Sequence, residues 1–231
     1  MKKPIMAIGA HIGDMELSAG GVLASMALEG HPVITVALTS GEKGHPEGVD
    51  LETYRKQKQK EARRFTDLLG GVSIVLPYDD GTLYAHDEIK FEVADLIRMH
   101  RPDALITHWK NSMHKDHEAT HHIVNDAHFY AGLAGFRRKH DAHFAKGPHY
   151  AENWEDRPDF DPYLYIEVSE KGFDLWKEAI DTHAFVNASP SFEYKAYYET
   201  LMAVRGREAR KTYAQAFDVS PFAKRMIKST F

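Results

Sequence analysis

The chain has 231 residues, of which 43% are hydrophobic, and it carries a formal net charge of −5 with no cysteine. This length and hydrophobic content predict one sizeable α/β domain. The lack of cysteine excludes disulfides, thiolate zinc sites and cysteine nucleophiles. The negative charge argues against nucleic acid as the main partner. No apolar run reaches the roughly 18 residues of a membrane span, so we expect no membrane partner either.

The N-terminal sequence MKKPIMAIGA combines two lysines with a short apolar run, as a signal peptide would. Asp14 and Glu16 interrupt that run too early for a signal peptide, so we interpret it as the first strand. A cytoplasmic location is the expectation that follows.

The sequence predicts that a buried strand turns sharply into a helix between Ile5 and Gly30. The apolar run from Ile5 to Ile8 ends at Gly9-Ala10, delivers His11 and Asp14, and is followed by an amphipathic segment that Glu16 opens. Imidazole and carboxylate groups are good zinc ligands, which is one interpretation of His11 and Asp14. The other interpretation is a hydrogen-bonded core histidine beside an aspartate that caps the helix.

The rest of the chain alternates predicted strands with predicted helices. The further strands are residues 33–38, 72–76, 104–107 and 163–168, and the further helices are 53–69, 86–100, 118–130, 171–183 and 191–210. This alternation predicts a single α/β domain, 1–231, with a mainly parallel, doubly wound sheet and helices on both faces. Right-handed crossovers should connect its parallel strands.

Residues 131–161 lose this periodicity and predict a long functional loop or lid. Its histidines 140, 143 and 149 either bind a second metal or belong to a solvated, irregular loop, and we favour the loop. Tyr150 and Trp154 either stack on a sugar ring or fix the loop to the body of the domain. We expect the tail around 213–217 to pack against the site or cap it.

A second histidine cluster, residues 108–117, follows the fourth strand. His114 and His117 are three residues apart, as are His11 and Asp14, and the carboxyl ends of parallel strands lie at one edge of a sheet. Both pairs are therefore predicted to share a cleft. His11, Asp14 and His117 would form a two-histidine, one-carboxylate zinc site with a position left for water, with His114 beside that water.

These residues also resemble a known family. Residues 10–16 read AHIGDME and are followed by Gly20-Gly21, and residues 114–117 read HKDH. This pair of motifs is similar to A-H-P-D-D-x-E and H-P-D-H of the PIG-L or LmbE-like family of zinc-dependent de-N-acetylases. Weaker similarities occur at residues 39–42, 61–70, 80–83 and 213–217, so the resemblance spans nearly the whole chain.

The resemblance implies a Rossmann-like α/β fold, although no G-x-G-x-x-G motif is present to suggest dinucleotide binding. It implies a Zn²⁺ or other divalent metal, a small N-acetylated substrate and association into homo-oligomers. The metal ligands would be His11, Asp14 and His117, while His114 would stabilise the oxyanion or protonate the leaving amine and Asp116 would orient it. Substrate binding is assigned to Glu42, Lys58, Asp80 and Trp109, with Lys58 standing where the family has an arginine.

Gly13 stands where the family has its general base, an aspartate. A metal alone lowers the pKa of water to about 7, and a positioned base typically adds about 10²–10⁴-fold in rate. We therefore predict a slower enzyme unless another carboxylate substitutes. The candidates are Glu16, Glu42, Asp79, Asp80 and Asp116.

Two functions remain open from the sequence. One is a metal-dependent amidohydrolase that removes an acetyl group from an N-acetylglucosamine-type sugar or similar amide. The other is a degenerate family member that keeps the metal and binds a sugar-like ligand without hydrolysing it. A nucleotide-binding protein is disfavoured because the glycine-rich loop at 41–48 has no lysine-serine pair, and a serine hydrolase because no G-x-S-x-G elbow occurs.

Overall fold

The structure, a computed structural model, describes residues 2–225. The predicted domain 1–231 therefore includes Met1 and residues 226–231, which lie outside the described residues. The strands are β1 (Ile5–His11), β2 (Val33–Thr39), β3 (Val72–Tyr78), β4 (Ala104–Thr107), β5 (Lys146–Ala151), β6 (Leu164–Val168) and β7 (Tyr213–Val219). The α-helices are α1 (Asp14–Ser18), α2 (Gly20–Leu28), α3 (Leu51–Leu68), α4 (Asp87–His100), α5 (Lys115–Gly132), α6 (Glu170–Ile180), α7 (Ala184–Ala188) and α8 (Tyr194–Glu208), and two short 3₁₀ turns span Glu42–Gly44 and Pro221–Ala223.

The seven strands form one sheet in the order β3-β2-β1-β4-β5-β7-β6. The strands from β3 to β5 pair in parallel, and β7 pairs antiparallel with both β5 and β6. The predicted mainly parallel α/β sheet is thus confirmed. The order of the parallel strands reverses beside β1, between β2 and β4, and such a switch point is where α/β sheets bind ligands.

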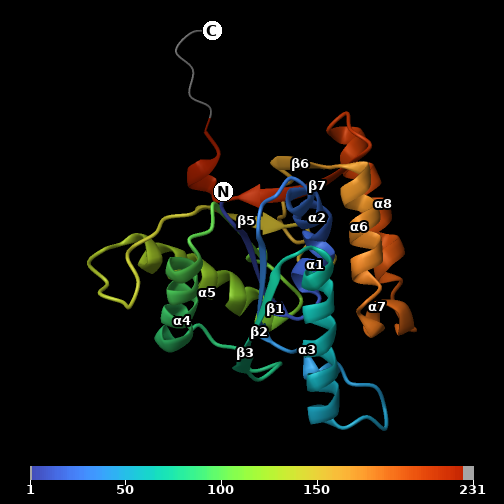
Figure 1. Cartoon of the computed structure of the whole chain (residues 1–231), viewed down its shortest axis with the longest axis horizontal. Helices are drawn as coiled ribbons and strands as arrows, with labels where there is room; N and C mark the ends of the chain where they lie inside the picture. The colour runs from blue at the N-terminus through green and yellow to red at the C-terminus, as the bar shows by residue number, and fades with distance from the viewer. Residues whose placement is uncertain (1, 226–231) are drawn as a thin grey trace.

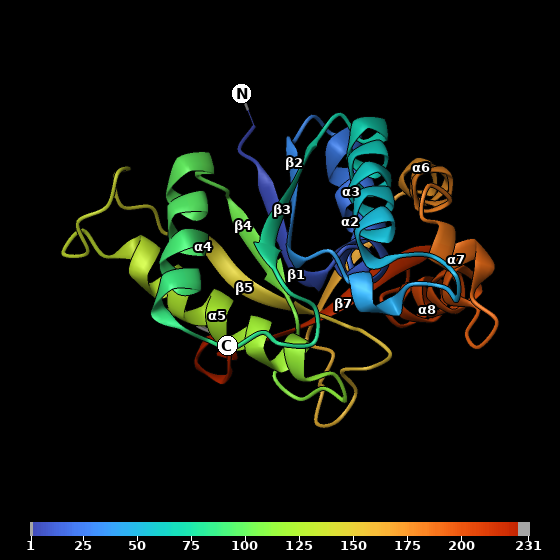
Figure 2. The same cartoon turned by 90° about the horizontal axis from the view of Figure 1, so that it is seen from below.

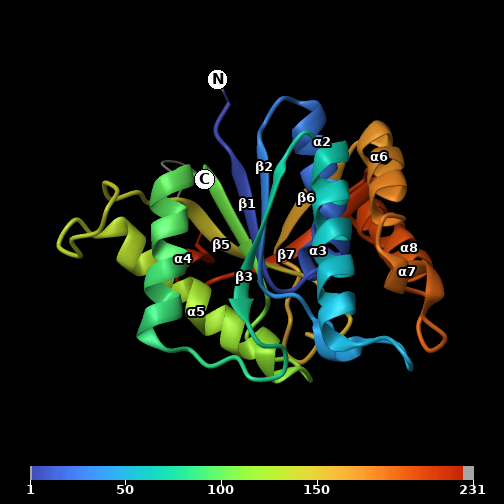
Figure 3. The ribbon, with the colours of Figure 1, turned by 60° about the horizontal axis from the view of Figure 1, so that its bottom comes forward.

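Helices cover both faces of the sheet, as predicted (Figure 1). Helices α4 and α5 lie on one face, and α2, α3, α6 and α8 lie on the other, and the turned views in Figure 2 and Figure 3 agree. Two apolar cores correspond to these layers: Ile89, Val93 and Ile123 belong to the α4–α5 core, and Leu23 and Trp176 belong to the opposite one. Residues of β1 alternate between the two cores, as the period of a buried parallel strand requires.

The segment 131–161 is more ordered than the sequence predicted. Residues 146–151 form β5, which continues the parallel sheet beside β4. The guanidinium of buried Arg98 holds the preceding loop by donating hydrogen bonds to the backbone oxygens of Ala131 and Phe136, among others. The sequence analysis missed this strand because its residues GPHYA do not alternate between apolar and polar, which is the pattern that predicts a half-buried strand. The predicted loop or lid over 131–161 is therefore interrupted by a strand, and loops occur only on either side of β5.

The tail also differs from the prediction. Residues 213–219 form β7, inside the sheet between β5 and β6, and do not cap the site. The side chain of Gln215 receives a hydrogen bond from Val22 N and donates to Leu17 O and Ser18 O. It thereby satisfies backbone groups where α1 ends and α2 begins. The tail supports the elements that carry Asp14 without contacting the site directly.

Gly20 allows α2 to approach α6 closely. A Cβ at Gly20 would lie 2.5 Å from Trp176 Cδ1, so a larger residue would displace that indole. The indole N–H of Trp176 donates to Glu16 O at 2.8 Å, and this hydrogen bond joins α6 to α1, the helix that begins at Asp14. Close packing at Gly20 thus fixes α1 and α2 against α6.

His183 belongs to the connection between α6 and α7, where it is the N-cap residue of α7. It is fully buried, its ring packs 5.7 Å from the rings of both Phe65 and Phe185, and neither ring nitrogen has a hydrogen-bond partner among residues 2–225. Burial and the charge of Lys58 lower the pKa of His183 to about 3. The folded protein therefore holds this imidazole neutral, whereas the unfolded chain protonates it near its ordinary pKa.

Replacing His183 with leucine should make the protein less sensitive to acid. The pKa of His183 is lower in the folded state than in the unfolded state. His183 therefore does not lower the free energy of unfolding above its unfolded-state pKa, but lowers it increasingly as the pH falls toward 3. Below about pH 6 the loss should approach about 1.4 kcal/mol per pH unit in wild type relative to His183→Leu. Urea unfolding between pH 7 and pH 4.5 measures this difference. The exposed His45, changed to leucine, is the matched control, and an unchanged slope in His183→Leu would contradict the prediction.

Candidate metal centre

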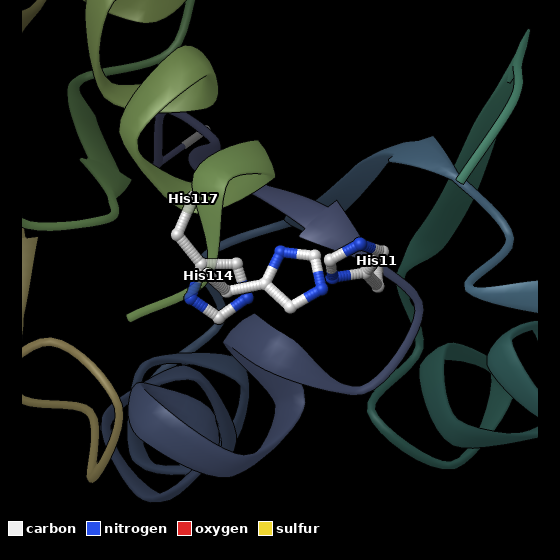
Figure 4. A group of neighbouring side chains, drawn as sticks. All are labelled: His11, His114 and His117. Atoms are coloured by element: carbon white, nitrogen blue, oxygen red, sulfur yellow. The ribbon is translucent and has the colours of Figure 1, made fainter. Parts of the chain in front are cut away.

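Three histidines meet at the carboxyl edge of the sheet (Figure 4). His11 is the last residue of β1, His114 caps the N-terminus of α5, and His117 lies in the first turn of α5. Nitrogen atoms of the three rings lie within 4.8 Å of one another. The structure therefore brings together the two sequence motifs, which are about a hundred residues apart.

Asp14 joins this group through a tight turn at Gly13. Gly13 has a φ of 110°, which reverses the chain after His11 and places Asp14 at the start of α1. Asp14 Oδ2 accepts a hydrogen bond from the backbone N–H of His11 at 2.7 Å, and it lies 3.2 Å from His11 Nδ1 and 3.5 Å from His117 Nε2. Asp14 does not cap the helix, since the N-cap residue is Gly13.

Asp156 is a site residue that the sequence analysis missed. Its fully buried carboxylate lies between two imidazoles, with Oδ1 2.9 Å from His117 Nδ1 and Oδ2 2.9 Å from His108 Nδ1. A proton on Nδ1 of His117 leaves Nε2 with a free lone pair toward Asp14, the arrangement that carboxylate partners impose on metal-binding histidines. Asp156 lies in the loop after β5, and no sequence pattern marks it as a partner of a histidine 39 residues earlier.

Buried charges balance each other around His108. The Nε2 atom of His108 lies 3.1 Å from Asp14 Oδ2. Burial lowers the pKa of His108, but the charges of Asp156 and Asp14 outweigh it and raise that pKa to about 9. Burial and the charge of His108 instead lower the pKa of His117 to about 4. His117 is thus neutral near pH 7, as a metal ligand must be.

The residues present fit a divalent metal. The structure contains three overlapping groups of metal-ligand atoms: His11, His114 and His117; Asp14, His108 and His117; and His11, Asp80 and Asp116. Nε2 of His11 is buried and forms no hydrogen bond of acceptable geometry among the described residues, although Asp80 Oδ1 is 3.1 Å away. Neutral imidazole and carboxylate are ligands that zinc prefers, and a cation would offset the excess of buried carboxylates.

Asp116 has a different role from the one predicted. Its carboxylate accepts hydrogen bonds from the backbone N–H groups of Gly81 and Leu83, and Oδ2 lies 3.6 Å from His11 Nε2. The bond to His114 comes from the backbone instead, because the Asp116 N–H donates to His114 Nδ1 at 3.2 Å. The carboxylate therefore ties the loop after β3 to α5, and Asp116 orients His114 through its backbone N–H and not through its carboxylate.

A cavity of about 650 Å³ opens above the three histidines. Lys58 and Asp80, two of the predicted substrate-binding residues, line it. The other two do not: Glu42 is buried and bound to Arg55, and the buried indole of Trp109 donates to Pro158 O. Both are held by partners that the sequence did not reveal, so their assignment to substrate binding was wrong.

Aromatic residues form much of the remaining cavity wall. Trp154 lines the cavity and stacks on Phe192 with ring centroids 4.5 Å apart, while Tyr150 is buried elsewhere and donates to Asn125 Oδ1. Of the two predicted stacking residues, only Trp154 therefore faces the cavity.

The buried His143 Nε2 lies 2.6 Å from Pro102 O, which shows that this ring anchors the fold instead of belonging to a solvated loop.

Phe185 occupies the space beside Gly13. A Cβ at Gly13 would lie 2.5 Å from Cζ of Phe185, so the ring fills the position in which an aspartate side chain would begin. Lys58 Nζ lies 4.4 Å from the centroid of the same ring. The lack of an aspartate at position 13 is thus linked to the packing of Phe185 on α7, which lies 172 positions later in the chain.

Glu155 is the second functional candidate that the sequence did not indicate. It lines the cavity, and its Oε2 is 3.8 Å from His117 Nε2. Burial and the charges of Asp14 and Asp156 raise the pKa of Glu155 to about 7. A carboxylate with this pKa beside a metal-ligand group is typical of an active site.

Comparison with known proteins fits this geometry. The family model PIG-L, described as GlcNAc-PI de-N-acetylase, matches residues 6–128, which is more than half of the chain. The chain belongs to the PIG-L family. The matched part contains both histidine motifs, whereas Asp156, Glu155 and Phe185 lie beyond it.

Relatives of this PIG-L protein carry two kinds of enzyme name. 4-Oxalmesaconate hydratase of Pseudomonas putida is 26% identical over 227 residues, covering 91% of this chain and 82% of that protein. Diacetylchitobiose deacetylase of Thermococcus kodakarensis is 24% identical over 225 residues, covering 95% and 84%. The crystal structure of 4-carboxy-2-hydroxymuconate hydratase from Pseudomonas putida superimposes with a TM-score of 0.86, 19% identity and full coverage of both chains.

Within residues 2–225, no helix of this PIG-L protein is long and apolar enough to span a bilayer.

The contact between Asp156 and His117 predicts a loss of metal affinity on substitution. Asp156→Asn removes the charge that holds the Nδ1 proton, so zinc affinity should fall about 10–100-fold. Competition with a chromogenic chelator measures it. Asp159→Asn, an exposed substitution in the same loop, should leave the affinity unchanged. Equal affinities of Asp156→Asn and wild type would show that Asp156 does not support a ligand.

Restoring the motif aspartate alone should destabilise the protein. Gly13→Asp combines a positive φ with a clash against Phe185 and should cost about 1–3 kcal/mol. Phe185→Ala in the same chain removes the clash, so the double variant should be less destabilised than the sum of the two single variants by about 1 kcal/mol. Urea unfolding of the four proteins measures this coupling, and strictly additive values would show that the ring does not obstruct Gly13.

Proposed function

We propose that this protein is a metal-dependent hydrolase that removes an N-acetyl group from an N-acetylglucosamine-type sugar or a similar small amide. The observation that supports it is the convergence of His11, Asp14, His114 and His117 at the base of one cavity. The relative named as a deacetylase and the family description agree with it. Zinc is the metal that we propose, because its ligand preferences match this set.

His11, Asp14 and His117 would hold the metal, which when bound would polarise the amide carbonyl and lower the pKa of water. His114 then acts on the oxygen of the substrate carbonyl. Its Nδ1 accepts the Asp116 N–H, so the neutral ring carries its proton on Nε2. That N–H can donate to the oxyanion that develops as water attacks, which is the most effective use of a fixed donor.

A second candidate, hydration of an unsaturated carboxylate, is favoured by Lys58. This lysine is only 6% exposed, lines the cavity, and forms no ion pair within 4.0 Å among residues 2–225. Burial lowers the pKa of Lys58, while Asp14, Glu16, Glu61 and Asp80 raise it from a distance. A buried ammonium without a close carboxylate would be satisfied by a substrate carboxylate. The relative named 4-oxalmesaconate hydratase agrees with this candidate.

One assay distinguishes these candidates. The zinc-loaded protein is incubated with N-acetylglucosamine and diacetylchitobiose, and in parallel with unsaturated dicarboxylates. We expect acetate release from an N-acetyl sugar, which Asp14→Ala abolishes because the metal is lost. Loss of the ultraviolet absorbance of a conjugated dicarboxylate, removed by Lys58→Met and retained in the exposed Lys56→Met, would support hydration instead. Ligand binding with neither reaction would contradict both and indicate a binding protein without catalysis.

A further inference from the structure

The cavity lacks an acid at the position where the family motif has one. Gly13 has no side chain, and Phe185 occupies the space beside it. Hydrolysis of an amide still requires a group that takes a proton from the attacking water and delivers one to the leaving nitrogen. Another side chain must therefore act as the general base. It must reach the cavity and have a carboxylate oxygen that is free to accept a proton.

Two further acids beside His11, Asp80 and Asp116, are already engaged. Asp80 Oδ2 accepts the Lys43 N–H at 3.0 Å, and Oδ1 lies 3.1 Å from His11 Nε2. Both oxygens of Asp116 accept backbone hydrogen bonds, as described above. A carboxylate that is stabilised by such donors is a weak proton acceptor. Neither residue therefore replaces the missing aspartate well.

The remaining sequence candidates do not face the cavity. Glu16 Oε2 accepts the Gly13 N–H at 3.1 Å in a capping box, and Glu42 Oε1 receives hydrogen bonds from Arg55 and from Asp80 N. Asp79 is exposed and pairs with Arg55. None of the three lines the cavity. All the substitutes that the sequence suggested are thus excluded by their partners or by their position.

Glu155 satisfies both requirements. It lines the cavity, its side chain is 22% exposed, and Oε2 lies 3.8 Å from the metal-facing Nε2 of His117. Neither carboxylate oxygen accepts a hydrogen bond or pairs with a lysine or arginine in the part of the chain that the structure describes. It is therefore an acid next to the predicted ligands whose lone pairs remain available.

The backbone on both sides of Glu155 is clamped. The Glu155 N–H donates to Asn153 Oδ1 at 3.2 Å, which also receives the hydroxyl of Tyr198 at 3.1 Å, and Glu155 O accepts the Met113 N–H at 3.2 Å. The next residue, Asp156, is fixed between His108 and His117. Such anchoring fixes the backbone from which the Glu155 side chain reaches the cavity, which a catalytic group requires.

We propose that Glu155 is the catalytic carboxylate that replaces the aspartate missing at Gly13. Glu155 Oε2 takes a proton from water as the water oxygen bonds to the carbonyl carbon, while His114 Nε2–H stabilises the oxyanion. When the tetrahedral intermediate collapses, the C–N bond breaks and the proton passes from Glu155 to the leaving nitrogen. The products are acetic acid and the amine, which near neutral pH become acetate and the ammonium form of the amine, and the side chains return to their starting states. This inference rests on the proposed amide hydrolysis.

The test compares Glu155→Gln with wild type and with Glu193→Gln, an exposed control outside the cavity. Glu155→Gln should keep one metal per chain with an affinity within about threefold of wild type, while kcat falls about 10²–10⁴-fold with little change in KM. Glu155→Ala should be equally slow and should recover activity when formate is added, because a small carboxylate can enter the space. A merely structural residue would not show this rescue. Glu193→Gln should match wild type in every measurement.

A second measurement separates this inference from the choice of substrate. Exchange of labelled oxygen from water into acetate requires the attack of water on the acetyl carbon and needs no amine. Wild type that exchanges oxygen while Glu155→Gln does not would support the inference even if no tested sugar is deacetylated. Retained exchange and retained kcat in Glu155→Gln would overturn it and leave the hydrolase intact, and loss of metal from Glu155→Gln would assign the residue as a ligand. Absence of both reactions in wild type would overturn the proposed function together with the inference.

Discussion

The carboxylate of Asp156, shared between His108 and His117, is the interaction on which the site depends. It joins three segments: the residue directly after β4, the start of α5 and the loop after β5. A fully buried carboxylate is unfavourable unless its oxygens are satisfied, and the two imidazoles satisfy both. This constraint determines which nitrogen of His117 faces Asp14. Removing the charge would leave two buried imidazoles without their partner, so the ligand geometry and the local fold are coupled.

The sheet order explains why these groups meet. Strands β1, β2, β4 and β5 run parallel, so the residues that follow them gather at one edge, and the reversal of strand order beside β1 leaves room above His11. Helix α7 closes the far side of that space with Phe185. The chain thus combines the family's histidine motifs with an apolar wall where an acid is expected. Loss of the acid at Gly13 and the presence of the ring are two aspects of one packing arrangement.

Buried charge is distributed unevenly through the site. Asp14, Asp80, Asp116, Glu155 and Asp156 lie close together, and His11, His108 and Lys58 are the nearby groups that can carry a positive charge. In a medium of low dielectric such a surplus of carboxylates is costly without a cation. A divalent ion relieves it, which is a physical reason for the metal that is independent of the family.

The sequence by itself determined the parallel core, the first four strands, the two histidine motifs and their convergence, because buried strands and paired motifs leave local patterns and parallel strands end at one edge. It did not reveal β5, the place of β7, the partners of Glu42 and Trp109, or the roles of Asp156 and Glu155. These follow from contacts between segments far apart in the chain, such as Asp156 with His117 and Gly13 with Phe185. Periodicity reports which face of an element is buried. Which side chain satisfies a buried charge is decided only when the elements pack, since that requires the relative positions of groups that share no local pattern.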